Sequence, residues 1–398
     1  MRKLFHNLFL NKFVLDYESL SFQDKDLKHF DNELKKCDQL FFDPQVEKNL
    51  ISKNEFLSSF AISKAENSTL TLSEAQNVFD LVLVNSDYTF IKEKIKNDHK
   101  LTIKDYEKLE FLNIVKVVRK YNQNLPQLED ITIEFITNLH LQLTQGLDIF
   151  QRYLPDFNIY KSGLLRDNDT IRVGDYVPAE YQEIAPCIDE ILSWIKENQT
   201  ITNVGVFHTL LYAIHPFNNG NKRVARVLEH LLLRIVGINN KNLYSTSYYY
   251  HQEKSRYYKY LLYSLEKKNL NYFVSFFQEA IALSILTVVQ SGLEVQRYQF
   301  IKAQNIDNTT KLLLQTLIKR RELQFGTFFK LLRKKMSKQT FISYLQRAVD
   351  GGLILRREAG RATYYKLSLT TKEEEFFDGL LTQVQAKLNY IPDSIKLS

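Results

Sequence analysis

Residues 213–226 read AIHPFNNGNKRVAR, and the fold prediction for the whole chain starts from this stretch. Pro216 biases the residue before it away from helical geometry, so His215 is expected in a loop. The Asn-Asn-Gly sequence that ends at Gly220 permits a tight turn. The following VARVLEHLLLRIV has strong three- and four-residue periodicity and predicts a helix from about Gly220 onward.

The start of this predicted helix is suited to bind an anion. Its free backbone N–H groups and the positive end of the helix dipole point to the same place. Arg223 and Arg226 lie three residues apart and therefore on one helix face, and Lys222 flanks them. A histidine beside such a helix start predicts a general base that works on a phosphoanhydride.

The stretch resembles the signature of the Fic (filamentation induced by cAMP) family, H-x-F-x-D/E-G-N-G-R-x-x-R. The likeness covers about residues 55–290. His208 fits the family's lead-in helix, residues 178–196 fit the helix after its flap, and residues 255–262 fit its Tyr-Tyr helix. The resemblance implies a mainly α fold, in which a Fic-type helical bundle carries a β-hairpin flap.

The flap is expected at residues 164–177, LLRDNDTIRVGDYV. Polar turn residues separate short β-prone pieces there and predict a hairpin. In Fic proteins the flap aligns the side chain of the target, so the resemblance implies this role for Thr170, Ile171, Arg172 and Val173. His140, in NLHLQL, is expected to be a packed helix residue.

The resemblance implies a protein adenylyltransferase, which moves AMP from ATP to a Ser, Thr or Tyr hydroxyl of a target protein. Some relatives also remove AMP from the modified protein. His215 would deprotonate the hydroxyl, and the phenylalanine of the loop would hold it in the core. The glycine and asparagine at the helix start would cradle the α- and β-phosphates, and the two arginines would hold the outer phosphates. The implied nucleotide-binding residues are Phe217, Asn219, Gly220, Asn221, Lys222, Arg223 and Arg226.

Two positions depart from the family pattern. Asn219 stands where the family has an acidic Mg²⁺ ligand, and a neutral amide is a poorer partner for a hard dication. Lys222 stands where most members have glycine, and a lysine there is found in the Doc-type branch, which phosphorylates its target. One hypothesis is that Lys222 supplies the positive charge of the metal. The other is that Asn219 marks a weak or inactive transferase. ATP is thus the expected substrate, and no metal ligand set is predicted.

A second segment resembles the inhibitory helix that some Fic proteins carry. Residues 58–75 read SSFAISKAENSTLTLSEA, and Glu66-Asn67 match the end of the motif S/T-x-x-x-E-G/N. Ile62 occupies the Ser/Thr position, so the match is partial. The resemblance implies that Glu66 pairs with Arg226 and excludes the γ-phosphate. The alternative is that Glu66 is a surface charge at a helix end.

The basic character of the chain is concentrated near its C-terminus. The chain has 53 Lys and Arg against 46 Asp and Glu, a net charge of +7. Residues 311–361 hold thirteen of the cations and three acids, which gives +10, so the other residues sum to −3. A clustered charge of this sign predicts a polyanionic partner for that segment.

The basic segment is expected to fold as three helices and two strands. The predicted elements are a helix at 311–320, a helix at 327–334 capped by Thr327, a helix after Ser337 that stops at Gly351-Gly352, and strands at 353–356 and 363–367. This order resembles a winged helix-turn-helix domain, which implies DNA contact by the third helix and the wing. The alternative is a dimerisation or docking module. The implied DNA-binding residues are Lys338, Gln339, Thr340, Ser343, Arg347, Arg356, Arg357 and Arg361.

Composition limits the remaining classes. Apolar residues make up 44% and charged residues 25%, which excludes wholesale disorder, and the low count of 12 Gly and 7 Pro favours long helices. Two cysteines are too few for a disulfide framework or a Cys-rich zinc site. The apolar stretch at 272–289 contains Gln278 and Glu279 and predicts a buried amphipathic helix, so no membrane association and a cytoplasmic location are expected. A homodimer is left open.

These patterns predict four parts of the chain and two classes of function. The parts are an N-terminal helical region at 1–104, a Fic core at 105–300, a winged helix-turn-helix domain at 308–370 and a tail at 371–398. The first class is the adenylyltransferase. The second is a DNA-binding regulator whose Fic domain senses a nucleotide or has lost activity, and a Doc-like kinase is a further alternative.

Overall fold

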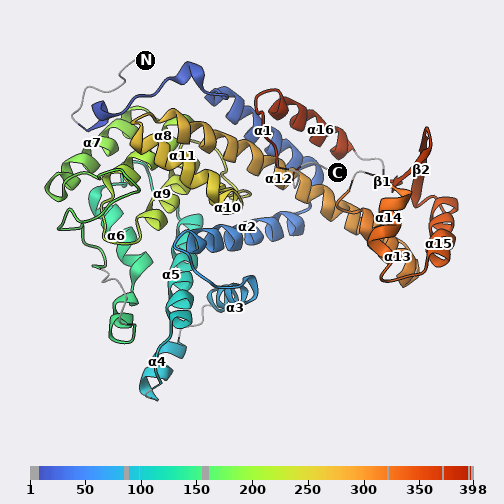
Figure 1. Cartoon of the computed structure of the whole chain (residues 1–398), viewed down its shortest axis with the longest axis horizontal. Helices are drawn as coiled ribbons and strands as arrows, with labels where there is room; N and C mark the ends of the chain where they lie inside the picture. Colours follow the sequence, from blue (N-terminus) through green and yellow to red (C-terminus); the bar gives the residue numbers. More distant parts are fainter. Residues whose placement is uncertain are drawn as a thin grey trace. The chain divides into compact units, whose positions relative to one another are not determined.

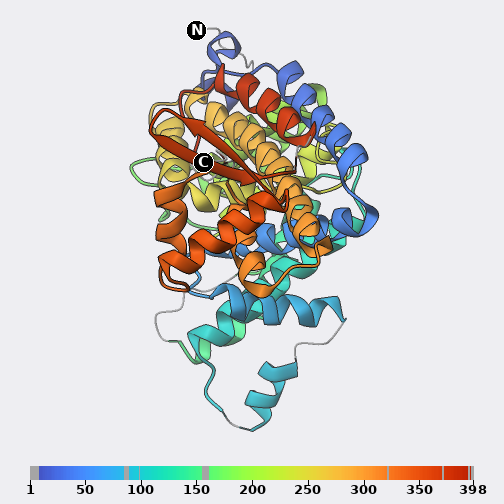
Figure 2. The same cartoon turned by 90° about the vertical axis from the view of Figure 1, so that its right-hand side faces the viewer.

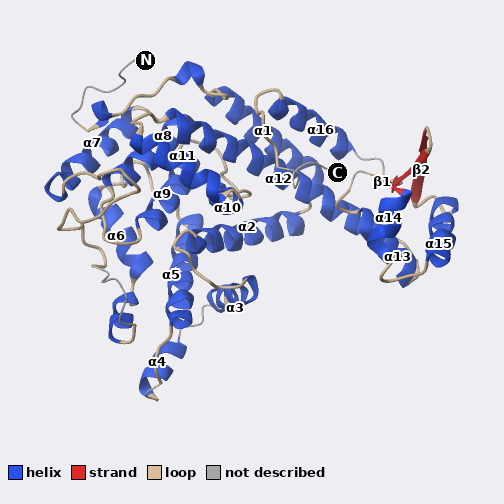
Figure 3. Cartoon of the chain, in the orientation of Figure 1, coloured by secondary structure: helices blue, strands red, loops and turns tan. Residues whose placement is uncertain are grey.

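The computed structural model describes residues 9–84, 89–97, 99–154, 161–320, 322–369, 372–392 and 395. These residues are mainly helical, as Figure 3 shows, which confirms the predicted fold class. The chain divides into two compact units, one of residues 1–31 and 48–284 and the other of residues 32–47 and 285–398. The chain crosses between the units inside three helices, α1 (Asp24–Phe41), α2 (Pro44–Lys64) and α12 (Asn271–Ala303).

The first unit contains the predicted catalytic stretch. Its helix α4 lies at one end of the unit in both views (Figures 1 and 2). Besides short 3-10 turns, its helices are α2 (Pro44–Lys64), α3 (Leu72–Leu83), α4 (Thr89–Lys96), α5 (Ile103–Gln123), α6 (Ile133–Thr144), α7 (Ile184–Glu197), α8 (Ile201–Ile214), α9 (Asn221–Ile235), α10 (Thr246–Gln252) and α11 (Lys254–Glu266).

The core of this unit is built around α8 and α9. Every residue of α8 is buried, which is expected for a helix that is apolar on all sides. Thr200 begins α8 by accepting a hydrogen bond from the backbone N–H of Asn203. Twelve of the fifteen residues of α9 are buried too, and the loop between the two helices therefore starts and ends in the core.

Helix α12 is long and apolar enough to cross a membrane by length and composition. However, 83% of its most apolar window is buried inside the protein. The prediction of a buried helix at 272–289 is therefore confirmed.

The second unit contains the predicted three helices and two strands, with a third, short strand. Its elements are α13 (Asn308–Leu317), β1 (Leu323–Gln324), α14 (Phe325–Leu332), α15 (Lys338–Asp350), β2 (Ile354–Ala359), β3 (Ala362–Leu367) and α16 (Lys372–Gln385). The strands form one antiparallel sheet in the order β1-β3-β2, with Ile354 opposite Leu367 and Leu323 opposite Tyr365. One apolar core joins α13, α14 and α15 to this sheet.

Helix boundaries in this unit differ from the prediction where a cap was misidentified. Helix α13 begins earlier than expected, because the carboxylate of Asp307 accepts hydrogen bonds from the next backbone N–H groups. Helix α14 begins at Phe325, so Thr327 lies inside it and is not its cap. Ser337 does cap α15, where its Oγ accepts a hydrogen bond from the N–H of Thr340 at 3.1 Å.

Candidate active site

His215 ends helix α8 in an unusual backbone conformation. Its φ is 52° and its ψ 62°, a left-handed geometry that costs free energy for a residue with a Cβ. Its ring Nδ1 lies 3.4 Å from the carbonyl oxygen of Tyr212, which favours a proton on Nδ1 and leaves Nε2 as the acceptor. Burial lowers the pKa of His215 to about 4, so the ring is neutral at pH 7. A neutral imidazole with one unprotonated nitrogen is what a general base requires.

The loop after His215 is fixed in the core by an aromatic stack. Phe217 is fully buried, and its ring is parallel to that of His140 with centroids 3.9 Å apart. The Nδ1 of His140 accepts a hydrogen bond from the N–H of Gly163, and its Nε2 therefore donates to the carbonyl of Asn219, each at 3.0 Å. His140 is thus packed, as predicted, and also positions the loop.

The asparagine at the start of α9 does not have its side chain available for a phosphate. The Oδ1 of Asn221 accepts from the backbone N–H of Phe217 at 2.9 Å, and its Nδ2 donates to the carbonyl of the same residue at 2.6 Å. Its side chain therefore closes the loop, and only its backbone N–H remains for an anion. Gly220 supplies the turn with φ 82°, and a Cβ there would lie 3.2 Å from both Arg223 and His140.

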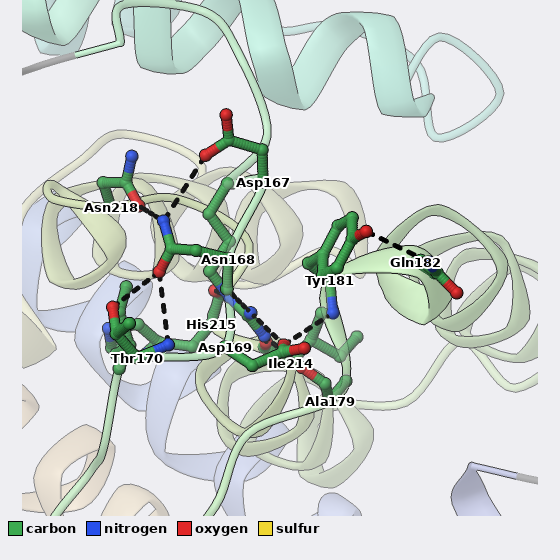
Figure 4. A network of polar contacts seen from close by, with 12 residues as sticks. Asp167, Asn168, Asp169, Thr170, Ala179, Tyr181, Gln182, Ile214, His215 and Asn218 are labelled. Atoms are coloured by element: carbon green, nitrogen blue, oxygen red, sulfur yellow. Dashed lines mark hydrogen bonds and ion pairs between the residues drawn. The ribbon is translucent and has the colours of Figure 1, made fainter.

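Arg166 ties the flap to the catalytic loop. Figure 4 shows the surrounding polar contacts, among them the hydrogen bond from Asn168 of the flap to Asn218 of the loop. The side chain of Arg166 is 3% exposed, and its Nε donates to the carbonyl of His215 at 2.9 Å. Its guanidinium also donates to the carbonyls of Asn168 and Ala179 and forms an ion pair with Asp169 at 3.0 Å. In return, the backbone N–H of Arg166 donates to the carbonyl of Pro216 at 2.8 Å. Sequence analysis missed this residue, because it looks like any charged residue of a turn.

The flap is shorter than a hairpin with two strands. Among the described residues, the only β-bridge within the flap joins Val173 and Tyr176, which exchange two hydrogen bonds of 3.1 Å around a two-residue turn. Upstream of it, Arg172 donates to the carbonyls of Asp169 and Ile171, and Thr170 donates to the side chain of Asn168. These local bonds replace a cross-strand ladder, so the backbone of the flap is left available to a partner.

The catalytic loop, the flap and the end of α2 enclose one cavity of about 330 Å³. Of the predicted site residues it brings together His215, the helix start, two flap residues and Glu66. It is lined by Glu66, Arg172, Val173, Gly174, Tyr212, His215, Asn218, Asn219, Gly220, Asn221, Lys222, Tyr258 and Leu262.

Glu66, just after the end of helix α2, neutralises Lys222, a cation that lines the cavity. The Nζ of Lys222 lies 3.6 Å from a carboxylate oxygen of Glu66 and donates to the carbonyl of Ala65 at 3.3 Å. The hydroxyl of Tyr258 donates to the same carbonyl at 2.9 Å, and Lys254 donates to the side chain of Asn67. The turn that follows α2, residues 65–67, thus presents its acceptors to α9 and α11.

Arg223 pairs with a carboxylate that was not predicted from sequence. Its Nη1 lies 2.9 Å from an oxygen of Glu110 on α5, and both side chains are buried. Burial raises the pKa of Glu110 to about 7, although the guanidinium lowers it and the hydroxyl of Tyr106 donates to it. An acid at an apolar helix position is the one sequence signal that would have revealed it.

Arg226 does not form the pair with Glu66 that was expected for it. Its side chain is 2% exposed, and its Nη1 donates to the carbonyls of Ala61 at 3.2 Å and Ser247 at 3.4 Å. Its guanidinium also lies 4.6 Å from the ring centroid of Tyr257. The expected Glu66–Arg226 pair is therefore not formed, because Lys222 stands nearer to the carboxylate and backbone carbonyls occupy the arginine.

The donor set of the cavity does not fit the magnesium ion that the family resemblance implies. Asn219 contributes no carboxylate, and its backbone carbonyl is bonded to His140. Within the part of the chain that the structure describes, the one acid that lines the cavity is Glu66, which is paired with Lys222. Among the described residues no group of three or more His, Cys, Asp or Glu is placed to hold a metal.

The basic residues of the second unit fall into two groups. On β2, Arg357 forms an ion pair with Glu322 and Arg356 one with Glu358, each at 2.5 Å. Arg361 is exposed in the turn between β2 and β3, and Thr340 is bonded to its cap, Ser337. The predicted residues Lys338, Gln339, Ser343 and Arg347 are exposed on α15. Sequence analysis did not single out a further exposed group on α14 and the turn that follows it, Lys330, Arg333, Lys334 and Lys335.

Comparisons with known proteins agree with this geometry. Residues 130–233 match the model of the Fic/DOC family. Protein adenylyltransferase fic-1 of Caenorhabditis elegans is 22% identical over 191 residues, which are 47% of this chain and 33% of that protein. A probable protein adenylyltransferase of Aquifex aeolicus, aq_aa38, is 32% identical over 96 residues, 23% of this chain and 29% of that protein. The chain thus spans about a third of the length of these relatives.

A solved structure shows the same fold. A fragment of C. elegans Fic-1 superimposes with a TM-score of 0.50 at 17% identity, over 67% of this chain and 72% of that one. At this identity the likeness concerns the fold alone. The matched segment includes His215, the loop that Phe217 fixes in the core and the helix start at Gly220. Residues 130–233 of this chain are therefore similar to the Fic/DOC family in sequence, and the fold agrees with that match.

Proposed function

We propose that the protein transfers the AMP part of ATP to a hydroxyl group of a protein side chain. The observation that carries this proposal is His215, a neutral histidine held in the cavity beside the start of α9. The cavity volume of about 330 Å³ suits part of a nucleotide. Relatives in worm and bacterium carry the name protein adenylyltransferase, which supports the same reaction.

In this reaction the hydroxyl oxygen of the target attacks the α-phosphorus of ATP. The bond from oxygen to the α-phosphorus forms while the bond from that phosphorus to the bridging oxygen of pyrophosphate breaks. Nε2 of His215 takes the hydroxyl proton, and pyrophosphate leaves with the electron pair. The backbone N–H groups at the start of α9 and the charge of Lys222 stabilise the phosphate oxygens.

The proposed activity is held back by the end of α2. Lys222, Arg226 and Tyr258 all donate to groups of this helix end, namely Glu66 and the carbonyls of Ala61 and Ala65. An incoming phosphate has to replace these acceptors, and the negative charge of Glu66 opposes it. This supports an inhibitory role for Glu66, exerted through Lys222 rather than Arg226.

We further infer that Lys222 supplies positive charge that a metal supplies in other members. The lack of a carboxylate at position 219 supports this inference, and so does the place of Lys222 in the lining of the cavity. A lysine at this position also leaves phosphorylation as an alternative outcome of the same fold.

One assay separates these outcomes. The protein is incubated with α-labelled or γ-labelled ATP and candidate acceptor proteins, with and without EDTA, beside His215→Ala. Transfer of the α-label that depends on His215 supports adenylyl transfer, and transfer of the γ-label alone identifies a kinase. A lack of transfer with either label, in a folded protein that binds ATP, would refute both.

A second function is favoured by the charge of the second unit. We propose that residues 308–367 are a winged helix domain that binds duplex DNA through α15 and the turn before it. Lys330, Arg333, Lys334, Lys335 and Lys338 are exposed, and none of them is in an ion pair within the described residues. Their positive charge is therefore available to phosphates, and salt-sensitive binding of a DNA duplex to the full chain tests this function.

A further inference from the structure

The tip of the flap has little backbone support of its own. Its turn, Gly174-Asp175, is closed by the bridge between Val173 and Tyr176, and residues 164–172 form no ladder. Outside the bridge, the N–H of Asp175 donates to a carboxylate oxygen of Glu266 on α11 over a long distance of 3.5 Å. Arg166 fixes the base of the flap, but no bond of that guanidinium reaches the tip. The position of the tip therefore depends on contacts with segments outside the flap, those of its side chains included.

One such contact comes from the N-terminal segment. Residues 9–20, which we call the N-terminal strap, run past α7 (Figure 1). The ring of Phe13 in the strap lies 6.4 Å from that of Tyr176 in the flap. Phe13 is 1% exposed and also packs edge-on against Phe9, with centroids 5.7 Å apart. The aromatic side chain that closes the flap turn thus rests on a buried cluster of the strap.

The strap is itself held firmly by the helices around it. The carboxylate of Glu190 on α7 accepts hydrogen bonds from the N–H groups of Phe9 and Leu10, at 3.1 and 2.8 Å. The N–H of Val14 donates to the carbonyl of Lys268, and its carbonyl accepts from the N–H of Leu270, both at 2.9 Å.

Its C-terminal half has two further anchors. The backbone of Asp16 exchanges hydrogen bonds of 2.8 and 2.7 Å with the side chain of Asn271, at the start of α12. The hydroxyl of Tyr17 donates to the side chain of Asn203 on α8 at 2.6 Å. A chain segment fixed at both halves acts as a rigid support for whatever packs on it.

We propose that the N-terminal strap is a positioning element of the flap and that Phe13 is its contact residue. The inference rests on the proposed function for its consequence, since the flap is where a target protein is expected to align. Phe13 fixes Tyr176, and the Val173–Tyr176 bridge then fixes residues 172–174 of the flap, which line the cavity. Loss of the Phe13 ring would leave nucleotide binding unchanged and weaken the alignment of a target.

A conformational experiment tests this inference without requiring catalysis. Hydrogen–deuterium exchange of the flap amides at 168–178 is compared in the wild-type chain, Phe13→Ala and Phe30→Ala. Phe30 is a matched control, because it is a buried aromatic residue of α1 that packs on Phe22 and not on the flap. An aromatic contact of this kind predicts a rise of about two- to tenfold in exchange of the flap amides in Phe13→Ala alone.

A variant on the side of the flap tests whether the effect arises from this contact or from a general destabilisation of the fold. Tyr176→Ala removes the same contact from the side of the flap, and combined with Phe13→Ala it should add little further exchange, since both remove one interaction. Equal exchange of the flap in Phe13→Ala and Phe30→Ala, or fully additive effects of the two single variants, would overturn the inference. ATP affinity, measured by calorimetry, should stay within about twofold of wild type in Phe13→Ala. A failure of adenylyl transfer in every variant would count against the proposed function and leave the exchange result intact.

Discussion

The Nζ of Lys222 lies 3.6 Å from the Oε2 of Glu66, and the two side chains are 23% and 22% exposed. This pair joins the first turn of α9 to the end of α2 at the edge of the cavity. Because the same lysine also donates to the carbonyl of Ala65, its charge is already shared between two acceptors. The proposed nucleotide site is therefore closed by an electrostatic contact that a phosphate can displace.

Removal of the Glu66 charge should strengthen ATP binding. A carboxylate within several ångströms of the phosphates, at an effective dielectric constant of about 20, opposes them by on the order of 1–2 kcal/mol. We expect Glu66→Gln to lower the Kd of ATP about tenfold in calorimetry and to raise self-modification. Glu197→Gln, an exposed acid at the end of α7, serves as the control and should change neither. Unchanged affinity in a folded Glu66→Gln would remove this residue from the inhibitory role.

The metal requirement should follow residues 219 and 222. We expect the ATP affinity of the wild-type chain to be nearly the same with Mg²⁺ and with EDTA, because Lys222 provides the charge in place of the ion. Lys222→Ala should weaken ATP binding about tenfold in both buffers, and Asn219→Asp should introduce a dependence on Mg²⁺. A steep loss of ATP binding by the wild type on chelation would contradict this assignment.

The dependence of the transfer rate on pH should be set by two groups. A base works only when it is unprotonated, so the contribution of His215 is present above its pKa of about 4 and is lost as the pH falls through it. Glu110, whose pKa is raised to about 7, gains a proton as the pH falls below 7 and weakens its pair with Arg223. We expect a rate profile with a shoulder near pH 7 that disappears in Glu110→Gln. A single transition at pH 6–7 that persists in that variant would show that His215 titrates normally.

The loop and the helix start were predictable from sequence because their signals are local. Pro216 and Gly220 restrict the backbone of the loop, and the three- and four-residue periodicity of the residues after Gly220 predicts α9. Burial of Phe217 was predictable too, since the family pattern requires it. The partners of the loop were not, because Arg166, Glu110 and His140 reach it from distant segments and only the tertiary fold brings them there.

The structures of the flap and of the C-terminal region were also predicted only in part from the sequence. β-prone residues in 164–177 predicted two strands, but side chains such as Thr170 and Arg172 bond to the nearby backbone and the ladder shrinks to one bridge. In the second unit the order of the three helices and of the two longer strands was predicted, whereas the short strand β1 was not. The ion pairs of Arg356 and Arg357 were not predicted. Arg356 pairs with Glu358, two residues away on the same strand, and Arg357 pairs with Glu322, which is 35 residues away and is brought near by the fold of the sheet.

Arg166 should be far more sensitive to substitution than its neighbour on the flap. It is buried with several carbonyl acceptors, so Arg166→Met leaves these groups unpaired and should lower the free energy of unfolding by about 3–5 kcal/mol. Arg172→Met, at an exposed position with bonds to local carbonyls, should cost less than about 1 kcal/mol. Urea unfolding of both variants measures the contrast. Equal costs would mean that Arg166 does not clamp the loop.

DNA binding should depend on the turn between α14 and α15 more than on the wing. Lys334 and Lys335 are exposed and in no ion pair within the described residues, whereas Arg356 and Arg357 are paired with carboxylates. We expect Lys334→Ala with Lys335→Ala to reduce the slope of log affinity against log salt by about 1.8 in fluorescence anisotropy with a DNA duplex. Arg356→Ala with Arg357→Ala should change it less. A larger effect of the wing pair would reverse the assignment of the surface.

The central claim is that the protein transfers AMP, with His215 as the general base, once Glu66 no longer pairs with Lys222. The most direct test compares Glu66→Gly with the double variant Glu66→Gly/His215→Ala, each incubated with α-labelled and with γ-labelled ATP and analysed for label bound to protein. The account predicts α-label on protein in the single variant, none in the double variant, and no γ-label in either. Incorporation of γ-label alone, or of α-label that survives the loss of His215, would contradict it.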